Sequence, residues 1–257
     1  MTFVFPKKIT RFDRLDSTMT EAQRLIEAGK ASHGQIILAQ EQTHGRGRQG
    51  RSWISMPGNL MASIILELDC SPFQAAELSF ASALSIGETI KSFIPNGAQV
   101  CYKWPNDVLV NQSKIAGVLL EAVESPPSGK LFLIVGIGLN VFSSPKNTLI
   151  QSICLADITK DDLSLEQVEL RLWKYFHTYF QVWLTEGFAS IRHLWLNNAA
   201  SRGQMITVST GEKTIDGIFM DIDPHGRLVL ETTMGDSITI LSGDVFFPQL
   251  RMNKKTK

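Results

Sequence analysis

The chain has 257 residues and a mass of 28.6 kDa, 44% of its side chains are hydrophobic, and 25 Lys and Arg balance 25 Asp and Glu. This composition supports a buried core and excludes a disordered or fibrous protein. A formal net charge of zero excludes a general nucleic-acid or membrane-surface binder, so we expect no DNA and no membrane among its partners. The three cysteines form no CxxC pair, so neither disulfides nor a zinc site is expected, and a reducing cytoplasm fits best.

The N-terminal half predicts helices and strands in alternation. The first helix begins at Thr18, where the run Thr-Met-Thr-Glu matches a capping box closed by Glu21. Apolar positions and turn residues then predict a strand over residues 35–39, a half-buried strand over 60–68, and one long helix that opens at Ser71-Pro72 and ends at Pro95.

Dense β structure is predicted from residue 99 onward, followed by two helices and a second β region. Strands are expected over 100–104, 108–110, 115–123 and 131–141, close enough in the chain to pair as antiparallel hairpins. One helix starts near Ser164 and another runs over 188–197. After Arg202, short strands alternate with turns, which is typical of a small β-barrel. We therefore expect a larger domain over residues 1–200, a barrel over 201–250 and a basic tail over 251–257.

The segment GRGRQGR over residues 45–51 is the strongest local anomaly. Its glycines allow the backbone to wrap around an anion, beside Arg46, Arg48 and Arg51. The segment also matches GxGxxG, but we reject a dinucleotide fingerprint because Trp53 makes an immediate helix improbable. A kinase-type loop is rejected as well, since no HRD or DFG segment follows. The alternative of a mobile, basic surface loop stays open.

A second group of charges lies in the segments KWPND and KIAG. A bend between two strands carries Lys103 and Asp107. Lys114 opens the returning strand on its apolar face, where an ammonium needs an anion unless it reaches solvent along the sheet rim. The other members of that predicted face are Ala116, Val118 and Leu120. Asp107 is a candidate ligand for Mg²⁺, and a plain turn-capping aspartate is the alternative.

The strand LFLIVGIGLN over residues 131–140 has two unlike faces. One face is aliphatic throughout, and the other contains Gly136, Gly138 and Asn140. Two glycines in register weaken a strand, so we expect something flat to lie against the sheet there, with Asn140 as a polar contact. Close packing of a helix is the alternative. Gly117 on a neighbouring strand is expected to extend the same glycine floor.

Basic residues from these segments supply five positive charges beside Asp107. They are Arg46, Arg48, Arg51, Lys103 and Lys114. Such a set suits a triphosphate together with a carboxylate. Joining a carboxylate to an α-phosphate needs cations on both anions and on the departing pyrophosphate, and it needs no protein nucleophile. No Ser/His/Asp or Cys/His arrangement is evident, and the five histidines show no ligand spacing.

Four motifs in one order make the sequence similar to the biotin protein ligases. They are GRGRQGRSW, KWPNDV, KIAGVLLE and VGIGLNV, with Ser17-Thr18 upstream. The resemblance implies an α+β fold, with a catalytic domain like that of class II aminoacyl-tRNA synthetases, built on a mixed, mainly antiparallel sheet with flanking helices, and an SH3-like C-terminal barrel. It implies that biotin and ATP form biotinyl-5′-AMP and pyrophosphate. Biotin then passes to a specific lysine of a biotin carboxyl carrier protein domain of acetyl-CoA carboxylase or a related carboxylase.

The resemblance also implies roles for individual residues. The catalytic residues would be Lys114, Arg46 and Arg48, with Lys114 bridging the carboxylate and the α-phosphate. Biotin would be bound by Ser17, Thr18, Gln42, Gly45, Arg46, Lys114, Gly117, Gly136 and Gly138. ATP would be bound by Arg48, Arg51, Trp53, Lys103, Asn106, Asp107 and Asn140, with Mg²⁺ on Asp107.

The sequence departs from the family pattern at two places. Met19 follows Ser-Thr where the family has Asn or a similar polar residue. Only 16 residues precede Ser17, so we expect no winged-helix DNA-binding domain and no repressor activity, while a homodimer is compatible with the resemblance. Two other interpretations stay open. One is a lipoate-protein ligase, which shares the fold and the adenylation chemistry, and the other is a non-catalytic module that keeps the adenylate slot.

Overall fold

Two β-sheets and five α-helices build the part of the chain that the computed structural model describes, namely residues 5–95, 97–126, 128–146, 148, 151–159 and 162–247. The predicted basic tail over 251–257 lies outside these residues. None of the helices described is both long and apolar enough to cross a membrane.

The larger sheet has seven strands in the order β1-β2-β3-β7-β6-β5-β4. β1 runs parallel to β2 and all other neighbours pair antiparallel, so the mainly antiparallel sheet and its hairpins are confirmed. The strands are β1 (Lys8–Leu15), β2 (Gln35–Gln42), β3 (Leu60–Glu67), β4 (Val100–Lys103), β5 (Asp107–Val110), β6 (Ser113–Glu124) and β7 (Leu131–Leu139).

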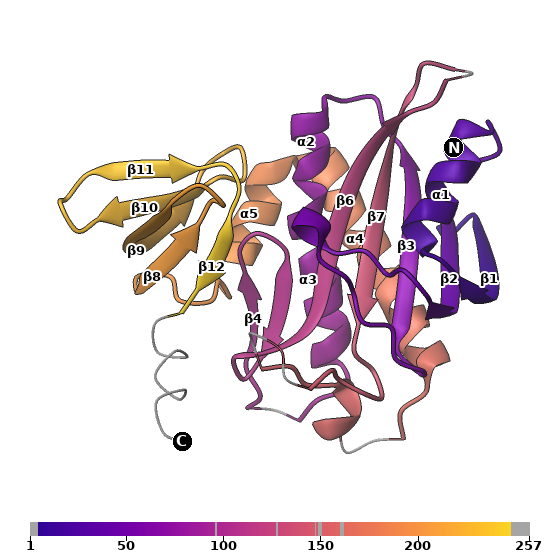
Figure 1. The fold of residues 1–257 in the computed structure, drawn as a ribbon, viewed down its shortest axis with the longest axis horizontal. Coiled ribbons are helices and arrows are strands. Elements are labelled where there is room, and N and C mark those ends of the chain that lie inside the picture. The colour runs from indigo at the N-terminus through magenta and orange to yellow at the C-terminus, as the bar shows by residue number, and fades with distance from the viewer. Residues whose placement is uncertain are drawn as a thin grey trace.

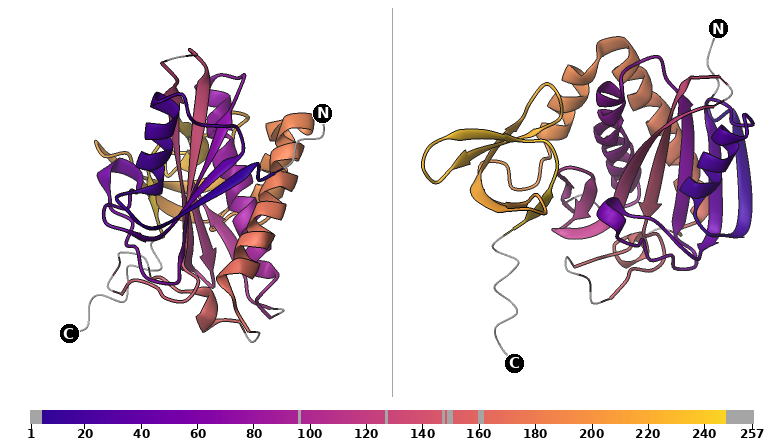
Figure 2. Two further views of the ribbon diagram at one scale, coloured as in Figure 1. Left: turned by 90° about the vertical axis from the view of Figure 1, so that its right-hand side faces the viewer. Right: turned by 45° about the horizontal axis from the view of Figure 1, so that its top comes forward.

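Helices cover both faces of this sheet, and the left view of Figure 2 shows the sheet edge-on between α1 and α4 (Figures 1 and 2). The helices are α1 (Thr18–Glu27), α2 (Pro72–Ala76), α3 (Leu78–Lys91), α4 (Leu165–Glu186) and α5 (Phe188–Leu196), with short 3₁₀ turns η1 (Arg48–Gly50) and η2 (Leu155–Asp157). The α+β architecture with flanking helices is therefore confirmed.

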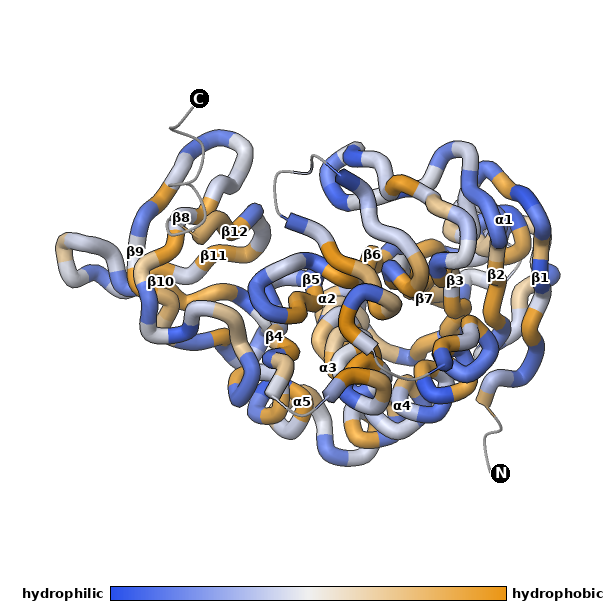
Figure 3. Tube along the Cα trace, turned by 90° about the horizontal axis from the view of Figure 1, so that it is seen from below, coloured by the Kyte–Doolittle hydropathy of each residue, from blue (hydrophilic) through white to orange (hydrophobic). Residues whose placement is uncertain are grey.

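The two unlike faces predicted for β7 serve two different packing layers. Val135 and Ile137 enter the larger core with the helices α3, α4 and α5, whereas Phe132 and Ile134 pack with Met19 of α1. Alternation in a strand sends successive side chains to opposite faces, so one strand can complete both layers. Apolar segments, orange in Figure 3, run along the central strands β3, β6 and β7, and hydrophilic segments lie mostly at the periphery.

A five-stranded C-terminal sheet follows the helices, in the order β11-β10-β9-β8-β12. Its strands are β8 (Met205–Ser209), β9 (Thr214–Ile222), β10 (Leu228–Thr232), β11 (Ser237–Ile240) and β12 (Asp244–Phe246). The predicted turn residues Gly211, Gly226 and Gly235 all have positive φ, between 79° and 89°. The indole of Trp104 donates a hydrogen bond to the carbonyl of Gly226 (3.0 Å), which ties this sheet to the β4–β5 turn.

The capping box predicted at Thr18 is wrong, although the helix begins there. Ser17 is the N-cap residue, and its side chain makes no capping hydrogen bond. The Thr18 hydroxyl is buried and contacts the side chains of Gln42 (3.2 Å) and Ser63 (2.8 Å) instead. The Thr18 hydroxyl therefore forms hydrogen bonds with distant residues, and it does not cap the helix as the local sequence predicts.

Two further expectations need correction. The single helix predicted from Ser71-Pro72 is in fact two helices, α2 and α3, which meet at Glu77. Its predicted start is confirmed, since Ser71 is the N-cap of α2 and forms a capping box with Gln74. The sequence analysis also missed β1, because most of its side chains are exposed and show no clean alternation. Its position depends on the parallel pairing with β2 and on a bidentate ion pair from Arg11 to Glu169 of α4 (2.9 and 2.7 Å).

Candidate active site

Strand register places distant residues of the predicted site in one row across the sheet. Lys103 pairs with Asp107, Asp107 with Gly117, and Gly117 with Gly138. Residues that pair across strands point to the same face, so this row carries two charged side chains beside two glycines. The glycine floor that the sequence predicts over Gly117 and Gly138 is confirmed.

Lys114 lies on the face opposite to the one predicted. Val108 pairs with Ala116 but Leu109 pairs with Lys114, so Ile115 is the extra residue of a β-bulge in β6. A bulge reverses the alternation, which sends Ala116 into the larger core and turns Lys114 toward the glycine face. The sequence pattern assumed regular alternation and therefore assigned Lys114 to the face of Ala116.

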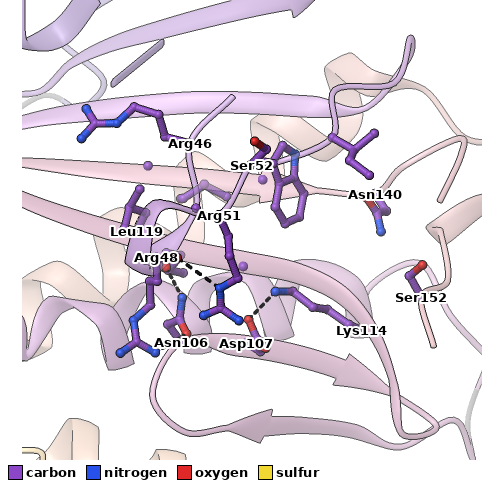
Figure 4. Close-up of a pocket in the computed structure, with 18 of the residues that line it drawn as sticks. Arg46, Arg48, Arg51, Ser52, Asn106, Asp107, Lys114, Leu119, Asn140 and Ser152 are labelled. Atoms are coloured by element: carbon purple, nitrogen blue, oxygen red, sulfur yellow. Dashed lines mark hydrogen bonds and ion pairs between the residues drawn. The ribbon is translucent and has the colours of Figure 1, made fainter. Parts of the chain in front are cut away.

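Asp107 links the two lysines of the site. Its Oδ1 lies 2.6 Å from Nζ of Lys114 (Figure 4), and its Oδ2 lies 3.6 Å from Nζ of Lys103. Burial by itself would raise the pKa of Asp107, but the charges of Lys114 and Lys103 outweigh it and hold that pKa below its usual value. Burial lowers the pKa of Lys103, and the charge of Asp107 opposes this shift. One carboxylate thus lies between two ammonium groups, so the three side chains together keep one uncompensated positive charge.

Two side chains of the protein itself already cover the glycine floor. A Cβ on Gly138 would lie 2.3 Å from the Trp53 indole, and a Cβ on Gly136 would lie 2.6 Å from Sδ of Met19. At Gly138 the flat group expected over the floor is the Trp53 indole. At Gly136 the alternative of helix packing is correct, because Met19 belongs to α1. Trp53 also lies under the Lys114 ammonium, 5.7 Å from Nζ to the ring centroid.

The opposite end of the site is polar but uncharged. The Gln42 side chain accepts hydrogen bonds from the backbone N–H of Thr18 (2.9 Å) and from its hydroxyl. Ser17 is 1% exposed, and its hydroxyl has no hydrogen-bond partner within the protein. Nearer to Lys114, two more atoms have no partner within the protein: Nε1 of Trp53, and Oδ1 of Asn140, whose Nδ2 donates to the carbonyl of Ile153 (3.2 Å). Buried polar atoms without a partner are costly, and Ser17, Trp53 and Asn140 all line the cavity, where a bound ligand can supply the missing partners.

The glycine-rich segment folds back on itself over the site. Gly47 donates to the carbonyl of Arg51 (2.7 Å), and Gln49 and Gly50 turn the chain with φ of 54° and 72°. Arg48 reaches the side chain of Asn106 (3.4 Å), so it points toward the Lys114 and Asp107 side of the cavity (Figure 4).

Arg46 points away from this group in Figure 4 and pairs with Glu121 of β6 (2.9 Å). Its predicted contact with the substrate carboxylate requires the side chain to leave that pair, so the catalytic role of Arg46 stays a prediction. Gly45 does not line the cavity, and the carbonyl of Trp53 lies only 2.4 Å from where its Cβ would be. A close approach of two backbone segments explains this glycine without a ligand.

A cavity of about 240 Å³ collects nearly all of the predicted site residues. Those that line it are Ser17, Thr18, Gln42, Arg46, Arg48, Arg51, Trp53, Lys103, Asn106, Asp107, Lys114, Gly117, Gly136, Gly138 and Asn140. The sequence analysis missed Asp244, Val245 and Phe246 of β12, which also line it. Five basic and two acidic side chains face this cavity, so it carries an excess of positive charge.

The residues of the cavity do not form a metal site by themselves. No group of three or more His, Cys, Asp or Glu side chains that could hold a metal ion occurs within the described residues. Each oxygen of Asp107 faces an ammonium group, so a divalent cation on this carboxylate would meet two like charges. The structure therefore favours Asp107 as the counter-ion of two lysines, and the predicted Mg²⁺ ligation remains untested.

We expect the segment from Gly45 to Arg51 to exchange its amide hydrogens rapidly without ligand and to become protected when biotin and ATP are added together. The side chains of Arg46 and Arg51 are exposed, and the backbone hydrogen bonds of the segment stay within residues 45–53 and do not reach the sheet. Hydrogen exchange read by mass spectrometry measures this, with β7 as the internal reference. Equal protection in the presence and absence of ligands would show a rigid loop.

Comparison with known proteins agrees with this geometry. The model of the biotin/lipoate A/B protein ligase family matches residues 11–140, and that of the biotin protein ligase C-terminal domain matches residues 202–247. A biotin–[acetyl-CoA-carboxylase] ligase of Paracoccus denitrificans is 36% identical, over 91% of this chain and 98% of its own length. The bifunctional ligase/repressor BirA of Bacillus subtilis is 30% identical, over 91% of this chain and 72% of its own length.

Among solved structures, the biotin protein ligase from Aquifex aeolicus in complex with biotin and ATP is similar along nearly the whole chain. It matches with a TM-score of 0.77 and 28% identity, covering 93% of this chain and 98% of that one. Fold, motif order and both family models thus agree, and the chain belongs to the biotin/lipoate A/B protein ligase family, as one of the biotin protein ligases.

Proposed function

We propose that this enzyme activates biotin as biotinyl-5′-AMP and then transfers biotin to a lysine of a biotin carboxyl carrier protein domain. The observation that carries the proposal is one cavity with two unlike ends. One end presents Lys103, Lys114, Arg48 and Arg51 to anions, and the other presents uncharged, buried polar groups over a glycine floor. A ligand with a neutral polar head and a carboxylate tail, used together with a triphosphate, matches both ends.

The polar end suits the ureido head of biotin. A ureido group offers two N–H donors and one carbonyl acceptor. The hydroxyls of Ser17 and Thr18 and the side-chain amide of Gln42 can each donate and accept hydrogen bonds, so they can bind both kinds of group. The apolar walls formed by Trp53 and Met19 suit the rings and the aliphatic tail between head and carboxylate. The tail would lead toward Lys114, which stands at the cationic end.

In the first half-reaction, a carboxylate oxygen of biotin attacks the α-phosphorus of ATP, and the bond from that phosphorus to the β-phosphate oxygen breaks. Pyrophosphate leaves, and the acyl adenylate remains. Lys114 would lie between the two anions that react, and Arg48 and Arg51 would hold the departing phosphates. Cations fixed in position before the reaction stabilise charge as it develops, so no protein nucleophile is needed.

In the second half-reaction, the amine of the carrier lysine attacks the acyl carbon of the adenylate. The amide bond forms, the bond between that carbon and the phosphate oxygen breaks, AMP leaves, and the attacking nitrogen loses a proton. Arg51, whose side chain is 52% exposed, marks the open side of the cavity from which this lysine would enter. The carrier domain belongs to acetyl-CoA carboxylase or a related carboxylase.

Finer points of the same proposal concern fold, metal and cell compartment. The catalytic unit over residues 1–200 would be related to class II aminoacyl-tRNA synthetases, and residues 201–250 would form an SH3-like barrel. Mg²⁺ would arrive on the oxygens of the nucleotide phosphates, since it binds through few carboxylates together with phosphates. The three cysteines are free, which supports a reducing cytoplasm.

Incubation of the full-length protein with ATP, Mg²⁺, labelled biotin and an isolated carrier domain tests both half-reactions at once. We expect pyrophosphate release that depends on biotin, and label on the carrier domain only when its acceptor lysine is present. If the protein binds the ligands but releases no pyrophosphate, the non-catalytic module is the correct interpretation.

A lipoate-protein ligase is the second candidate, because the matched family covers both kinds of ligase. The match of residues 202–247 to a domain of biotin protein ligases favours biotin. A ligand that binds only the folded state raises the melting temperature, so we expect biotin at 100 times its Kd to stabilise the protein by about 2.7 kcal/mol, and lipoate to leave it unchanged. Stabilisation by lipoate alone, read by differential scanning fluorimetry, would reverse the assignment.

A further inference from the structure

The C-terminal sheet contributes one strand directly to the cavity. β12 lies at its edge, paired with β8 (Figure 1). Its residues Asp244, Val245 and Phe246 line the cavity. The backbone at Gly243 is pressed against β8, since a Cβ there would lie 2.9 Å from the carbonyl of Ser209. The position of the strand is thus set by the sheet to which it belongs and not by the cavity.

Asp244 contacts both arginines at the tip of the glycine-rich segment. Its Oδ1 lies 2.8 Å from Nη2 of Arg51 and 3.9 Å from Nη1 of Arg48. The same Nη1 of Arg48 donates to the carbonyl of Gly243 (3.3 Å). Asp244 is 23% exposed and Arg48 18%, so their contact is partly shielded from water, whereas Arg51 is 52% exposed.

The arginines need such an anion because they lie among like charges. Burial lowers the pKa of Arg48, and the charges of Asp244 and Asp107 oppose this shift. Asp107 is already shared by Lys103 and Lys114, which leaves Asp244 as the one other carboxylate among the described residues that line the cavity. Without Asp244, repulsion from the lysines and from each other would favour other positions for Arg48 and Arg51.

The contacts of Asp244 leave room for a phosphate on the same arginines. Arg51 uses Nη2 for Asp244 and Nε for the carbonyl of Arg48 (3.1 Å), and Arg48 uses Nη1. The remaining donors are Nη1 of Arg51 and Nη2 and Nε of Arg48. A guanidinium offers five N–H donors in a fixed fork, so each arginine can hold the carboxylate and an anion together.

We propose that Asp244 is a positioning residue of the C-terminal sheet, which holds Arg48 and Arg51 in place to receive the triphosphate of ATP. This inference rests on the proposed function, and it assigns to the C-terminal sheet a part in nucleotide binding. The carboxylate draws the two guanidinium groups to the side of the cavity that would receive the phosphates, and it keeps them aimed at the phosphates once bound ligands have ordered the segment from Gly45 to Arg51.

Steady-state kinetics of the full-length Asp244→Asn variant tests the inference. We expect the KM for ATP to rise about tenfold, the change that corresponds to one charge-assisted hydrogen bond, and kcat for pyrophosphate release to fall. The KM for biotin should stay within about twofold, because the polar end of the cavity is not touched. Asp244→Glu, which keeps the carboxylate, should recover most of the ATP affinity. Asp244→Asn should cost less in the Arg51→Ala background than in the unchanged protein, because only the contact of Asp244 with Arg48 is then left to lose.

Asp221→Asn is the matched control. Asp221 of β9 pairs with Arg192 of α5, so it also joins the C-terminal sheet to the rest of the chain, but it does not line the cavity. It should leave the KM for ATP unchanged. An equal rise of the KM for ATP in both variants would overturn the inference, because it would show that Asp244 only helps to attach the C-terminal sheet to the rest of the chain.

A lower KM for ATP in Asp244→Asn would overturn the inference in the opposite direction, by showing that the carboxylate only competes with the phosphates. Failure of the proposed function is separately visible, as the absence of biotin-dependent pyrophosphate release by the unchanged protein. In that case, thermal shift by ATP alone still compares the unchanged protein with the two variants.

Discussion

Replacement of Lys114 by alanine is expected to lower the rate of adenylate formation by about 10²- to 10³-fold and to change biotin affinity far less. The ammonium lies 2.6 Å from Asp107 and over the indole of Trp53, at the end of the cavity where the carboxylate and the α-phosphate would meet. Negative charge there increases as the new bond forms, so the lysine stabilises the transition state more than the bound substrates.

Single-turnover pyrophosphate release and equilibrium binding of biotin measure the two effects of Lys114→Ala separately. Lys130→Ala is the control, because its ammonium pairs with Glu67 on the surface and does not line the cavity. Equal losses of rate and of biotin affinity would make Lys114 a residue that only binds the ground state.

Replacement of Asp107 by alanine is expected to destabilise the folded protein by about 3 kcal/mol, the lower end of what breaking a buried ion pair costs. Asp107 is 9% exposed and Lys103 is 6% exposed, so the variant would leave the Lys103 ammonium buried without its anion. Urea denaturation measures the loss. Adding Lys103→Met should recover part of it, because the uncompensated charge is then absent. If Asp107→Ala unfolds at the same urea concentration as the unchanged protein, the ion pairs of Asp107 with Lys103 and Lys114 contribute no stability.

The pH dependence of this loss follows from the direction of the pKa shift. The pKa of Asp107 is held below its usual value in the folded state, so its contribution to stability is complete above about pH 4, near the pKa of an unfolded aspartate. The contribution is lost as the pH falls through the folded-state pKa. The stability difference between the unchanged protein and Asp107→Ala should therefore be constant near neutral pH and shrink in acid.

Several parts of this site could be predicted from the sequence because local chemistry determines them. The strand with Gly136 and Gly138 on one face has a single regular alternation, so its two layers follow from the order of the residues. Arg46, Arg48 and Arg51 stand among three glycines, and residue type alone predicts an anion site there, a role that stays a prediction. Four motifs in one order then restricted the chemistry to one family.

Other parts depended on contacts between segments that are far apart in the chain. One extra residue, Ile115, reversed the face of Lys114, and no local pattern marks a bulge there. The hydroxyl of Thr18 binds Gln42 and Ser63 and does not cap the helix, because a buried hydroxyl bonds to the partners that tertiary packing places beside it. Trp53 covers Gly138 only because the loop that carries it folds back over the sheet.

By itself, the sequence determined which residues supply charge, which strand offers a glycine floor and which family the protein resembles, because these properties belong to short segments. The tertiary structure alone decided which charged side chains form ion pairs, and which distant segments supply their partners. Arg46 meets Glu121 after a separation of 75 residues, and Arg51 meets Asp244 after a separation of 193 residues. The short strand Asp244–Phe246 has no distinctive sequence, and it reaches the cavity because the C-terminal sheet packs beside the glycine-rich segment. Electrostatic interaction depends on distance in space, which sequence spacing does not contain.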